Sequence, residues 1–378
     1  MRVAFLSNYL NHVQLPFCQE MIKLVGDQNF LFIACAPFDV ARKNCGFDDM
    51  NNYFPWVIRS YEDDSRVIDI LKSFDVVIST PELTHYNSIR LETGKLTFFA
   101  SERLLKRGYM WRWNPLKIWR TYSRINKFKK YNNLFVLCYG AFVAYDYIYS
   151  GFPKNRYFTW AYLPVVRSGS MQKNNTEISI LWTGRLIDLK RPFDLLDACE
   201  LLFSKGYQFK ITYIGDGPLA KKLKERITQS KYSAYMNYMG SLKNEEVLKT
   251  MSKQSILVVT SDRHEGWGAV VNEAMSSGCC VIASDAIGSA PILVQNGTTG
   301  FRYQSGNVME LSDRIKFCLD NPEKLAEIQK QAALTMQNDW NAVVAAQRFV
   351  KLANNLMIGV NSSPYKEGLC SPALIFKY

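Results

Sequence analysis

Residues 255–278 read SILVVTSDRHEGWGAVVNEAMSSG, and this stretch decides the predicted fold. Its first seven residues are typical of a buried strand, and a polar loop that contains glycine follows them. The remainder is typical of a short helix, which Gly278 can end in a left-handed conformation. A strand, a loop and a helix in this order form the repeating unit of a parallel α/β sheet.

The same alternation runs through the whole chain, so we predict an α/β protein with two Rossmann-like domains of parallel sheet. Strands are expected at 2–7, 29–35, 75–80, 95–100 and 134–138, and again at 178–184, 208–215, 235–240, 255–261 and 280–285. Because ligands of such sheets bind outside the carboxyl ends of the strands, the two sheets are expected to face each other across a cleft.

A polar stretch rich in Ser and Asn, residues 164–176, predicts the linker between the two domains. The N-terminal domain then covers 1–163 and the C-terminal domain covers 177–339. Residues 340–378 are expected to form a helix that crosses back toward the first domain, followed by a tail.

The composition narrows the range of partners and compartments. The net charge of +12 over 378 residues predicts an anionic partner, which could be nucleic acid, a membrane surface or a phosphorylated substrate. Nine cysteines without a CxxC motif predict a reduced, cytoplasmic protein. Residues 2–7 are expected to be a strand and not part of a signal peptide, and no apolar run approaches the roughly 20 residues of a membrane span.

Two glycine turns follow predicted strands in the second half. Gly184 ends one strand, and Arg185 and Lys190 follow it. Two cations at the carboxyl end of a strand suit a diphosphate, although they could equally be ordinary surface charges. The turn at 215–217, Gly-Asp-Gly, lets a backbone approach a ligand closely, but such turns also occur as plain connections.

Two carboxylates occupy the stretch at 255–278. Glu265 is expected at the mouth of the loop, and Glu273 is expected about one and a half turns into the helix. Gly266 and Gly268 would leave backbone N–H groups free near the helix start, where an anion is favoured. The carboxylates could accept hydrogen bonds from the hydroxyls of a sugar and a ribose. Alternatively, both could stabilise the helix dipole.

The order and spacing of these residues resemble the retaining glycosyltransferase family 4, which has the GT-B fold. The resemblance covers about 120 residues of the second half. It is carried by Gly184-Arg185, Lys190, Gly215-Asp216-Gly217-Pro218, Met239-Gly240, Glu265-Gly266-Trp267-Gly268, Glu273, Gly288 and the run 296–301.

The resemblance implies a role for each motif. Arg185 and Lys190 would bind the diphosphate of a nucleotide sugar, Glu265 would contact the transferred sugar, and Glu273 would bind the ribose. The amides of residues 266–268 would hold the sugar and phosphate. Gly184 and the turn formed by Gly215, Asp216 and Gly217 would line the donor site, and the backbone near Met239 and Gly240 would contact the nucleobase. No metal or other cofactor is expected, and the sequence contains no Asp-x-Asp motif.

The family's acceptors bind mainly to the first domain, where this sequence matches less well. Many members have a Gly-Gly turn after the first strand, which this chain replaces with residues 7–12 and their single histidine, His12. A histidine that many members carry after a middle strand is replaced by Ser101, Glu102 and Arg103. These four residues are the candidates for acceptor contact. Residues 99–108, FASERLLKRG, resemble a branch found in bacterial capsule, exopolysaccharide and O-antigen gene sets.

Residues 103–131 carry ten Lys or Arg, seven aromatic residues and no acid. If 116–130 is helical, Ile118, Trp119, Tyr122 and Ile125 share one face, and Lys117, Arg120, Arg124 and Lys127 share the other. This basic aromatic segment could pack on the core with a solvated basic face, or lie on an anionic membrane surface. Nucleic-acid binding is a third alternative, but no recognised nucleic-acid module accompanies the segment.

We therefore expect a retaining, metal-independent glycosyltransferase that acts on a nucleotide-diphosphate sugar. The expected acceptor is a polyprenyl-diphosphate-linked glycan precursor in cell-surface polysaccharide synthesis, with the enzyme peripheral on the inner face of the cell membrane. The alternatives are a soluble small-molecule acceptor and a non-catalytic binding protein with the same fold.

Overall fold

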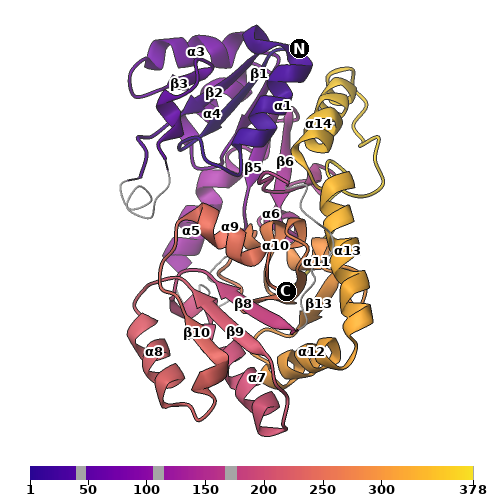
Figure 1. Ribbon diagram of the computed structural model, residues 1–378. Helices are drawn as coiled ribbons and strands as arrows, with labels where there is room; N and C mark the ends of the chain where they lie inside the picture. The colour runs from indigo at the N-terminus through magenta and orange to yellow at the C-terminus, as the bar shows by residue number, and fades with distance from the viewer. Residues whose placement is uncertain (40–47, 105–114, 167–176, 378) are drawn as a thin grey trace. The chain divides into compact units, whose positions relative to one another are not determined.

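The structure is a computed structural model that describes residues 1–39, 48–104, 115–166 and 177–377 (Figure 1). The chain divides into two compact units. Unit 1 contains residues 1–165 and 339–378, and unit 2 contains residues 166–338. Most of the predicted linker, residues 167–176, lies outside the described residues.

Unit 1 is built on a seven-stranded parallel sheet with the order β3-β2-β1-β4-β5-β6-β7. Its strands are β1 (Val3–Ser7), β2 (Phe30–Ala34), β3 (Val57–Arg59), β4 (Val76–Ser79), β5 (Thr97–Ser101), β6 (Leu134–Tyr139) and β7 (Tyr157–Trp160). Most of these strands are buried along their whole length, which is typical of parallel strands that are covered on both faces. The sheet therefore needs helices on each side.

The helices of unit 1 are α1 (Leu15–Val25), α3 (Asp64–Ser73), α4 (Thr84–Glu92), α5 (Pro115–Asn126), α6 (Val143–Tyr149) and α14 (Ala342–Met357). Helices α1 and α14 pack together on one face of the sheet. There Phe349 of α14 meets Phe17, Phe98 and Trp160 at ring-centroid distances of 5.2–6.0 Å. Residues of α3, α5 and α6 enter the cores on the other face.

The tail after α14 runs along the edge of this sheet, a role that the sequence did not suggest. Thr159 of β7 donates its N–H to the Ser371 carbonyl at 2.8 Å and accepts from the Cys370 N–H at 2.8 Å. Ala373 donates to the Tyr157 carbonyl at 2.9 Å. The tail thus satisfies backbone groups that an edge strand would otherwise leave exposed.

Unit 2 is built on a six-stranded parallel sheet with the order β10-β9-β8-β11-β12-β13. Its strands are β8 (Ser179–Thr183), β9 (Lys210–Ile214), β10 (Met236–Tyr238), β11 (Ile256–Val259), β12 (Cys280–Ser284) and β13 (Gly300–Tyr303). Its helices are α7 (Pro192–Ser204), α8 (Ala220–Gln229), α9 (Asn244–Met251), α10 (Val270–Ser276), α11 (Ala290–Leu293), α12 (Val308–Asp320) and α13 (Pro322–Asn338).

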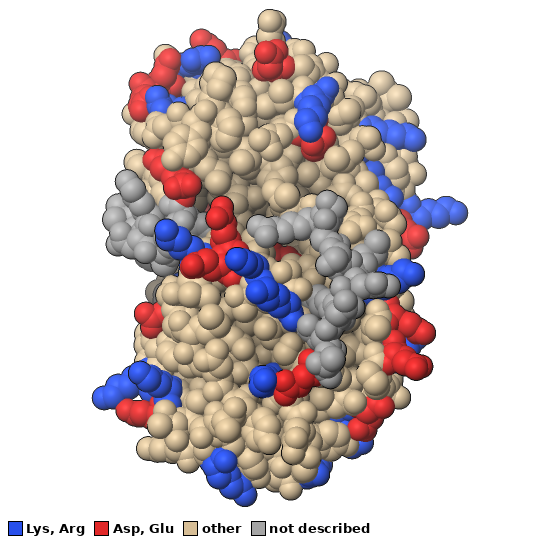
Figure 2. All heavy atoms as spheres, viewed as in Figure 1, with Lys and Arg blue, Asp and Glu red and all other residues tan. Residues whose placement is uncertain are grey.

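The predicted α/β class and both parallel sheets are confirmed, and each of the ten predicted strands is present. Three further strands, β3, β7 and β13, are present that were not predicted from the sequence. In the part of the chain that the structure describes, no helix is long and apolar enough to cross a membrane. On the face shown in Figure 2, basic and acidic side chains are mixed over the described residues of each unit.

Candidate active site

The carboxyl edge of the unit 2 sheet carries the predicted cations. Gly184 and Arg185 directly follow β8, and Lys190 ends a single 3-10 turn, Asp188–Lys190. The Arg185 side chain is exposed, and within the described chain no hydrogen bond or ion pair engages its guanidinium. It is therefore a cation that an anionic ligand could engage without breaking an existing ion pair.

Lys190 and Glu265 form the central ion pair of this edge. The Nζ of Lys190 lies 2.5 Å from Oε2 of Glu265, although the two residues are 75 positions apart, and their side chains are 16% and 17% exposed. This partial burial strengthens the attraction relative to a fully exposed pair. The sequence predicted both residues as ligands of one substrate but did not predict that they pair with each other.

A buried hydrogen-bond chain holds the backbone of Lys190. Thr260, just after β11, donates its hydroxyl to the Lys190 carbonyl at 2.6 Å. The Thr260 hydroxyl oxygen also accepts a hydrogen bond from the indole Nε1 of Trp182, in β8, at 2.9 Å. Sequence reasoning missed both supports, because a Thr after a strand and a Trp within one are ordinary core residues.

The loop before α10 is tied to the loop after β8. Asp262 donates its N–H to the Leu189 carbonyl at 2.8 Å, and Glu265 donates its N–H to the Asp262 carbonyl at 3.1 Å. The Asp262 carboxylate accepts from the His264 N–H and also meets its ring Nδ1, both at 2.8 Å. These contacts fix the backbone on either side of the Lys190–Glu265 pair.

The Gly-Asp-Gly turn brings two loops into close backbone contact. A Cβ on Gly215 would lie 1.9 Å from the Gly184 carbonyl oxygen, and one on Gly217 would lie 2.6 Å from that of Leu186. Leu186 in turn donates its N–H to the Asp216 carbonyl at 2.8 Å. The packing of one loop on the other therefore explains both glycines, and their predicted contact with a donor stays a prediction.

Residues after β10 complete this edge. Met239 is 42% exposed, and the Gly240 carbonyl accepts from the Gly215 N–H at 2.8 Å. The Tyr238 hydroxyl donates to the Gly215 carbonyl at 3.0 Å. Burial raises the pKa of Tyr238 above its ordinary value, which favours the protonated phenol that donates this bond. The predicted nucleobase contact of Met239 and Gly240 remains a prediction.

The start of α10 differs from the sequence expectation. Gly268 has a φ of +81°, which an α-helix does not accept, so the helix begins only at Val270. Glu273 consequently lies in the first turn of α10 and not one and a half turns into it. The predicted end is confirmed, because Gly278 follows the helix with a φ of +69°.

The Gly-Trp-Gly segment is anchored by its tryptophan. Trp267 is fully buried, and its Nε1 donates to Oδ1 of Asn272 at 2.7 Å. Its carbonyl accepts from the Ser289 N–H, and the Gly266 carbonyl accepts from the Gly288 N–H, both at 3.0 Å. The Trp267 side chain therefore packs in the core, and only its backbone can fulfil the predicted donor role.

The acceptor candidates lie at the carboxyl edge of the unit 1 sheet. His12 follows β1 and is half-buried, and Ser101 ends β5 and is buried. Glu102 accepts a hydrogen bond from the Tyr162 hydroxyl at 2.8 Å. Arg103 is paired with Asp146 at 3.8 Å, with side-chain exposures of 3% and 1%. This burial favours a structural role for Arg103, whereas the acceptor contacts of the four residues stay predictions.

The basic aromatic segment, residues 103–131, is described in part. Residues 105–114 lie outside the described residues, and helix α5 ends at Asn126, where a turn replaces the predicted helix to residue 130. Ile125 is fully buried, but Trp119 is 66% exposed. Ile125 and Trp119, which were predicted to share one helix face, therefore differ in burial, and core packing alone does not account for Trp119. Leu116, one turn earlier, is 67% exposed, so these two large apolar side chains of α5 are open to solvent.

Most of unit 2 matches a known family model. Residues 168–335, less than half of the chain, match the model described as glycosyl transferases group 1. Sulfoquinovosyl transferase SQD2 of Arabidopsis thaliana is 30% identical over 172 residues, which are 45% of this chain and 32% of the relative. The putative colanic acid biosynthesis glycosyltransferase WcaL of Escherichia coli is 24% identical over 187 residues, 48% of this chain and 46% of the relative. The matches thus span less than half of these curated relatives.

A solved structure shows a similar fold over nearly the whole chain. HepE of Anabaena, crystallised in complex with UDP, superposes with a TM-score of 0.72 at 17% identity. The match covers 94% of this chain and 100% of HepE. At this identity the likeness establishes the fold, which is that of the GT-B glycosyltransferases.

Proposed function

We propose that the protein is a retaining glycosyltransferase that uses a nucleoside-diphosphate sugar as its donor. The observation that carries the proposal is the Lys190–Glu265 pair at the carboxyl edge of the unit 2 sheet. Arg185, whose guanidinium has no ion pair within the described residues, follows β8 at the same edge, and residues 168–335 match the group 1 family model. Cations beside a carboxylate suit a ligand that has both phosphates and sugar hydroxyls. HepE, which shares the fold, was crystallised with UDP, and this supports a nucleoside diphosphate as ligand.

On donor binding, Lys190 and Glu265 would each exchange the other for a group of the donor. Lys190 would move from Glu265 to the diphosphate, where it and Arg185 neutralise the charge of the leaving group. Glu265 would then accept hydrogen bonds from the sugar hydroxyls, and Glu273 from the ribose. With two protein cations at the phosphates, we propose that the transfer needs no metal ion.

In the proposed step, the bond between the anomeric carbon and the phosphate oxygen breaks. A bond to the acceptor hydroxyl oxygen forms on the same face of the sugar, which retains the configuration. The acceptor proton passes to the departing phosphate oxygen, so no protein side chain has to serve as a covalent nucleophile. Glu265 orients the sugar in this scheme.

The proposed acceptor is a hydroxyl of a lipid-linked glycan precursor in cell-surface polysaccharide synthesis. The similarity to WcaL, which is assigned to colanic acid biosynthesis, supports polysaccharide synthesis as the setting. The exposed Trp119 and Leu116 on α5 support attachment to the cytoplasmic surface of a membrane, because Trp side chains favour the headgroup layer. Lys127, Lys129 and Lys130 follow them and are also exposed, which suits anionic lipids.

Donor binding tests the proposal most directly. We expect one of a panel of UDP-, GDP- and ADP-sugars to raise the melting temperature in the presence of EDTA. Arg185→Ala and Lys190→Ala should abolish this shift. Lys205→Ala should retain it, because Lys205 is an exposed cation between the end of α7 and the amino end of β9, whereas the site residues follow the carboxyl ends of the strands. A folded protein that no donor stabilises would contradict the proposal.

Two further measurements separate the alternatives. A donor-dependent shift without hydrolysis or transfer would favour a non-catalytic binding protein. Flotation with vesicles of phosphatidylglycerol should capture the wild type, and Trp119→Glu should weaken capture more than Tyr149→Glu, which alters another exposed aromatic side chain of unit 1. Equal flotation of both variants, or none of the wild type, would favour a soluble acceptor.

A further inference from the structure

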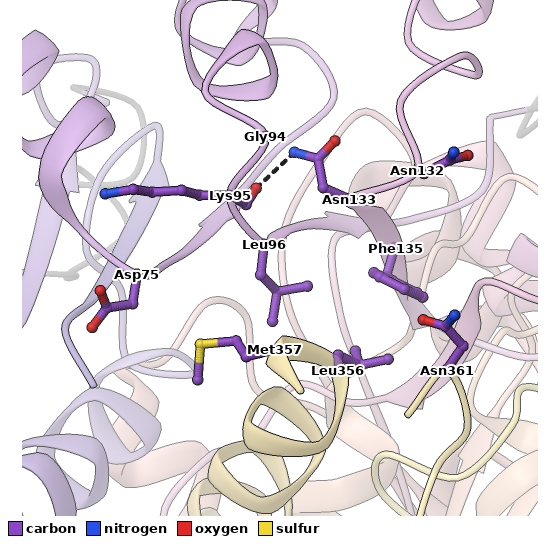
Figure 3. Close-up of a pocket in the computed structure, with 10 residues that line it drawn as sticks. All are labelled: Asp75, Gly94, Lys95, Leu96, Asn132, Asn133, Phe135, Leu356, Met357 and Asn361. Atoms are coloured by element: carbon purple, nitrogen blue, oxygen red, sulfur yellow. Dashed lines mark hydrogen bonds between the residues drawn. The ribbon is translucent and has the colours of Figure 1, made fainter. Parts of the chain in front are cut away.

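Unit 1 contains a cavity of about 310 Å³ at the edge of its sheet opposite the acceptor candidates (Figure 3). Asp75, Leu96 and Asn133 line it, and each directly precedes a strand, β4, β5 or β6. The last turn of α14 contributes Leu356 and Met357. Because substrates of open α/β sheets bind at the carboxyl ends, this cavity at the amino ends is separate from the proposed transfer site.

The walls of the cavity are held by a buried arginine. Arg90 of α4 is fully buried, and its Nη2 donates to the carbonyls of Asp75 and Leu96, both at 2.8 Å. Burial lowers its pKa to about 10, so the guanidinium stays charged at neutral pH. The Nδ2 of Asn133 donates to the Lys95 carbonyl at 2.7 Å, the bond drawn in Figure 3. These bonds join the segments before β4, β5 and β6 into one pre-formed frame.

The lining combines hydrogen-bonding groups with an apolar floor. In Figure 3 the side chains of Leu96 and Phe135 point toward Leu356 and Met357 of α14. The polar lining residues include Asn361 and one residue of each charge, Asp75 and Lys95. The Asp75 carboxylate accepts from the Arg2 N–H at 2.7 Å, and the Lys95 ammonium donates to the Ser73 carbonyl at 2.9 Å. The opposite charges give no net preference for an anion or a cation, and the apolar floor offers a surface to C–H groups.

We propose that this cavity binds a neutral glycan of one or two sugar rings. Hydroxyls would pair with the amide and carboxylate groups, and the C–H face of a ring would lie on the apolar floor. The volume is near the lower end of the roughly 300–1,000 Å³ of small-molecule sites, which fits one or two rings. The proposal rests on the cavity alone and does not require the proposed transfer activity.

Saturation-transfer NMR on the full chain tests this site with three neutral disaccharides: maltose, lactose and chitobiose. We expect saturation transfer to at least one of them in the wild type. Asn361→Ala should weaken that binding about fivefold, the effect of one lost hydrogen bond. Asn361 is exposed, so its loss should leave the fold intact. Asn354→Ala is the matched control, because Asn354 is an exposed asparagine of α14 that does not line the cavity.

Met357→Trp provides a second, independent variant that fills the cavity from the half-exposed end of α14. It should abolish the saturation transfer and leave any thermal shift by a nucleotide sugar unchanged. No transfer to the wild type from any of the three sugars would overturn the proposal. Transfer that persists equally in Asn361→Ala and Met357→Trp would also overturn it, since the sugar would then bind elsewhere.

Discussion

Each carboxyl edge of the two sheets holds a cation–carboxylate pair with low exposure to solvent, Lys190–Glu265 in unit 2 and Arg103–Asp146 in unit 1, but the two pairs differ in how far they are buried. In unit 2, Lys190 and Glu265 are 16% and 17% exposed and lie 2.5 Å apart. In unit 1, Arg103 and Asp146 are 3% and 1% exposed, and their nearest atoms are 3.8 Å apart. The proposed function requires the first pair to exchange partners with a ligand, whereas the burial of the second favours a structural role. We therefore propose a different role for this kind of contact at each edge.

The sharpest test of this comparison is the stability of the enclosed pair. Arg103→Met removes the cation beside the buried Asp146, and we expect a loss of about 3–5 kcal/mol in the free energy of unfolding. Lys190→Met should change that free energy by about 1 kcal/mol or less, because Glu265 can be hydrated. Urea unfolding measures both. A stable Arg103→Met protein with a raised KM for the acceptor would instead make Arg103 an acceptor contact.

Loss of Lys190 should have a small effect on stability but a large effect on activity. Lys190→Ala should lower kcat about 10²–10³-fold, since a preorganised charge at the leaving group is lost. The assay is transfer from the donor that stabilises the wild type, with Lys205→Ala as the matched loss of an exposed lysine. A near-normal rate in Lys190→Ala would show that the pair supports the loop and takes no part in the reaction.

A third comparison separates two glycines with positive φ in unit 2. Gly215 and Gly206 have φ values of +143° and +88°, but only Gly215 faces a backbone carbonyl, 1.9 Å from a built Cβ. Gly206→Ala should cost about 1 kcal/mol of stability from backbone strain alone. Gly215→Ala should cost about 3 kcal/mol, because the two loops must also separate. Equal costs in urea unfolding would contradict the loop packing.

This contrast explains which features the sequence could predict. A close backbone approach admits only glycine, so Gly215 and Gly217 form a recognisable motif, and both parallel sheets follow from apolar runs. The Arg103–Asp146 pair joins residues that are 43 positions apart, and no local sequence pattern predicts it. The same holds for the tail that pairs with β7. The start of α10 was predicted too early because apolar periodicity does not reveal the φ of Gly268.

The cavity in unit 1 escaped prediction for a related reason. Its lining comes from the ends of three strands and one distant helix, and the residues share no spacing along the chain. The buried Arg90 that braces it occurs in a helix of unremarkable pattern, so its five hydrogen bonds become visible only in three dimensions. Pairings of this kind depend on the whole fold.

The smallest expected effect concerns Thr260, whose hydroxyl holds the backbone of Lys190 in the Lys190–Glu265 pair. Thr260→Val keeps the shape of the side chain but removes the hydroxyl between Trp182 and the Lys190 carbonyl. The loss of this hydrogen bond should let the Lys190 backbone shift and lower kcat about fivefold to tenfold. Thr260→Ser keeps the hydroxyl and should restore most of the rate, which a purely steric role would not allow. If Ser and Val behave alike, the methyl group of Thr260 matters through packing, and the Lys190–Glu265 pair is positioned by its loops alone.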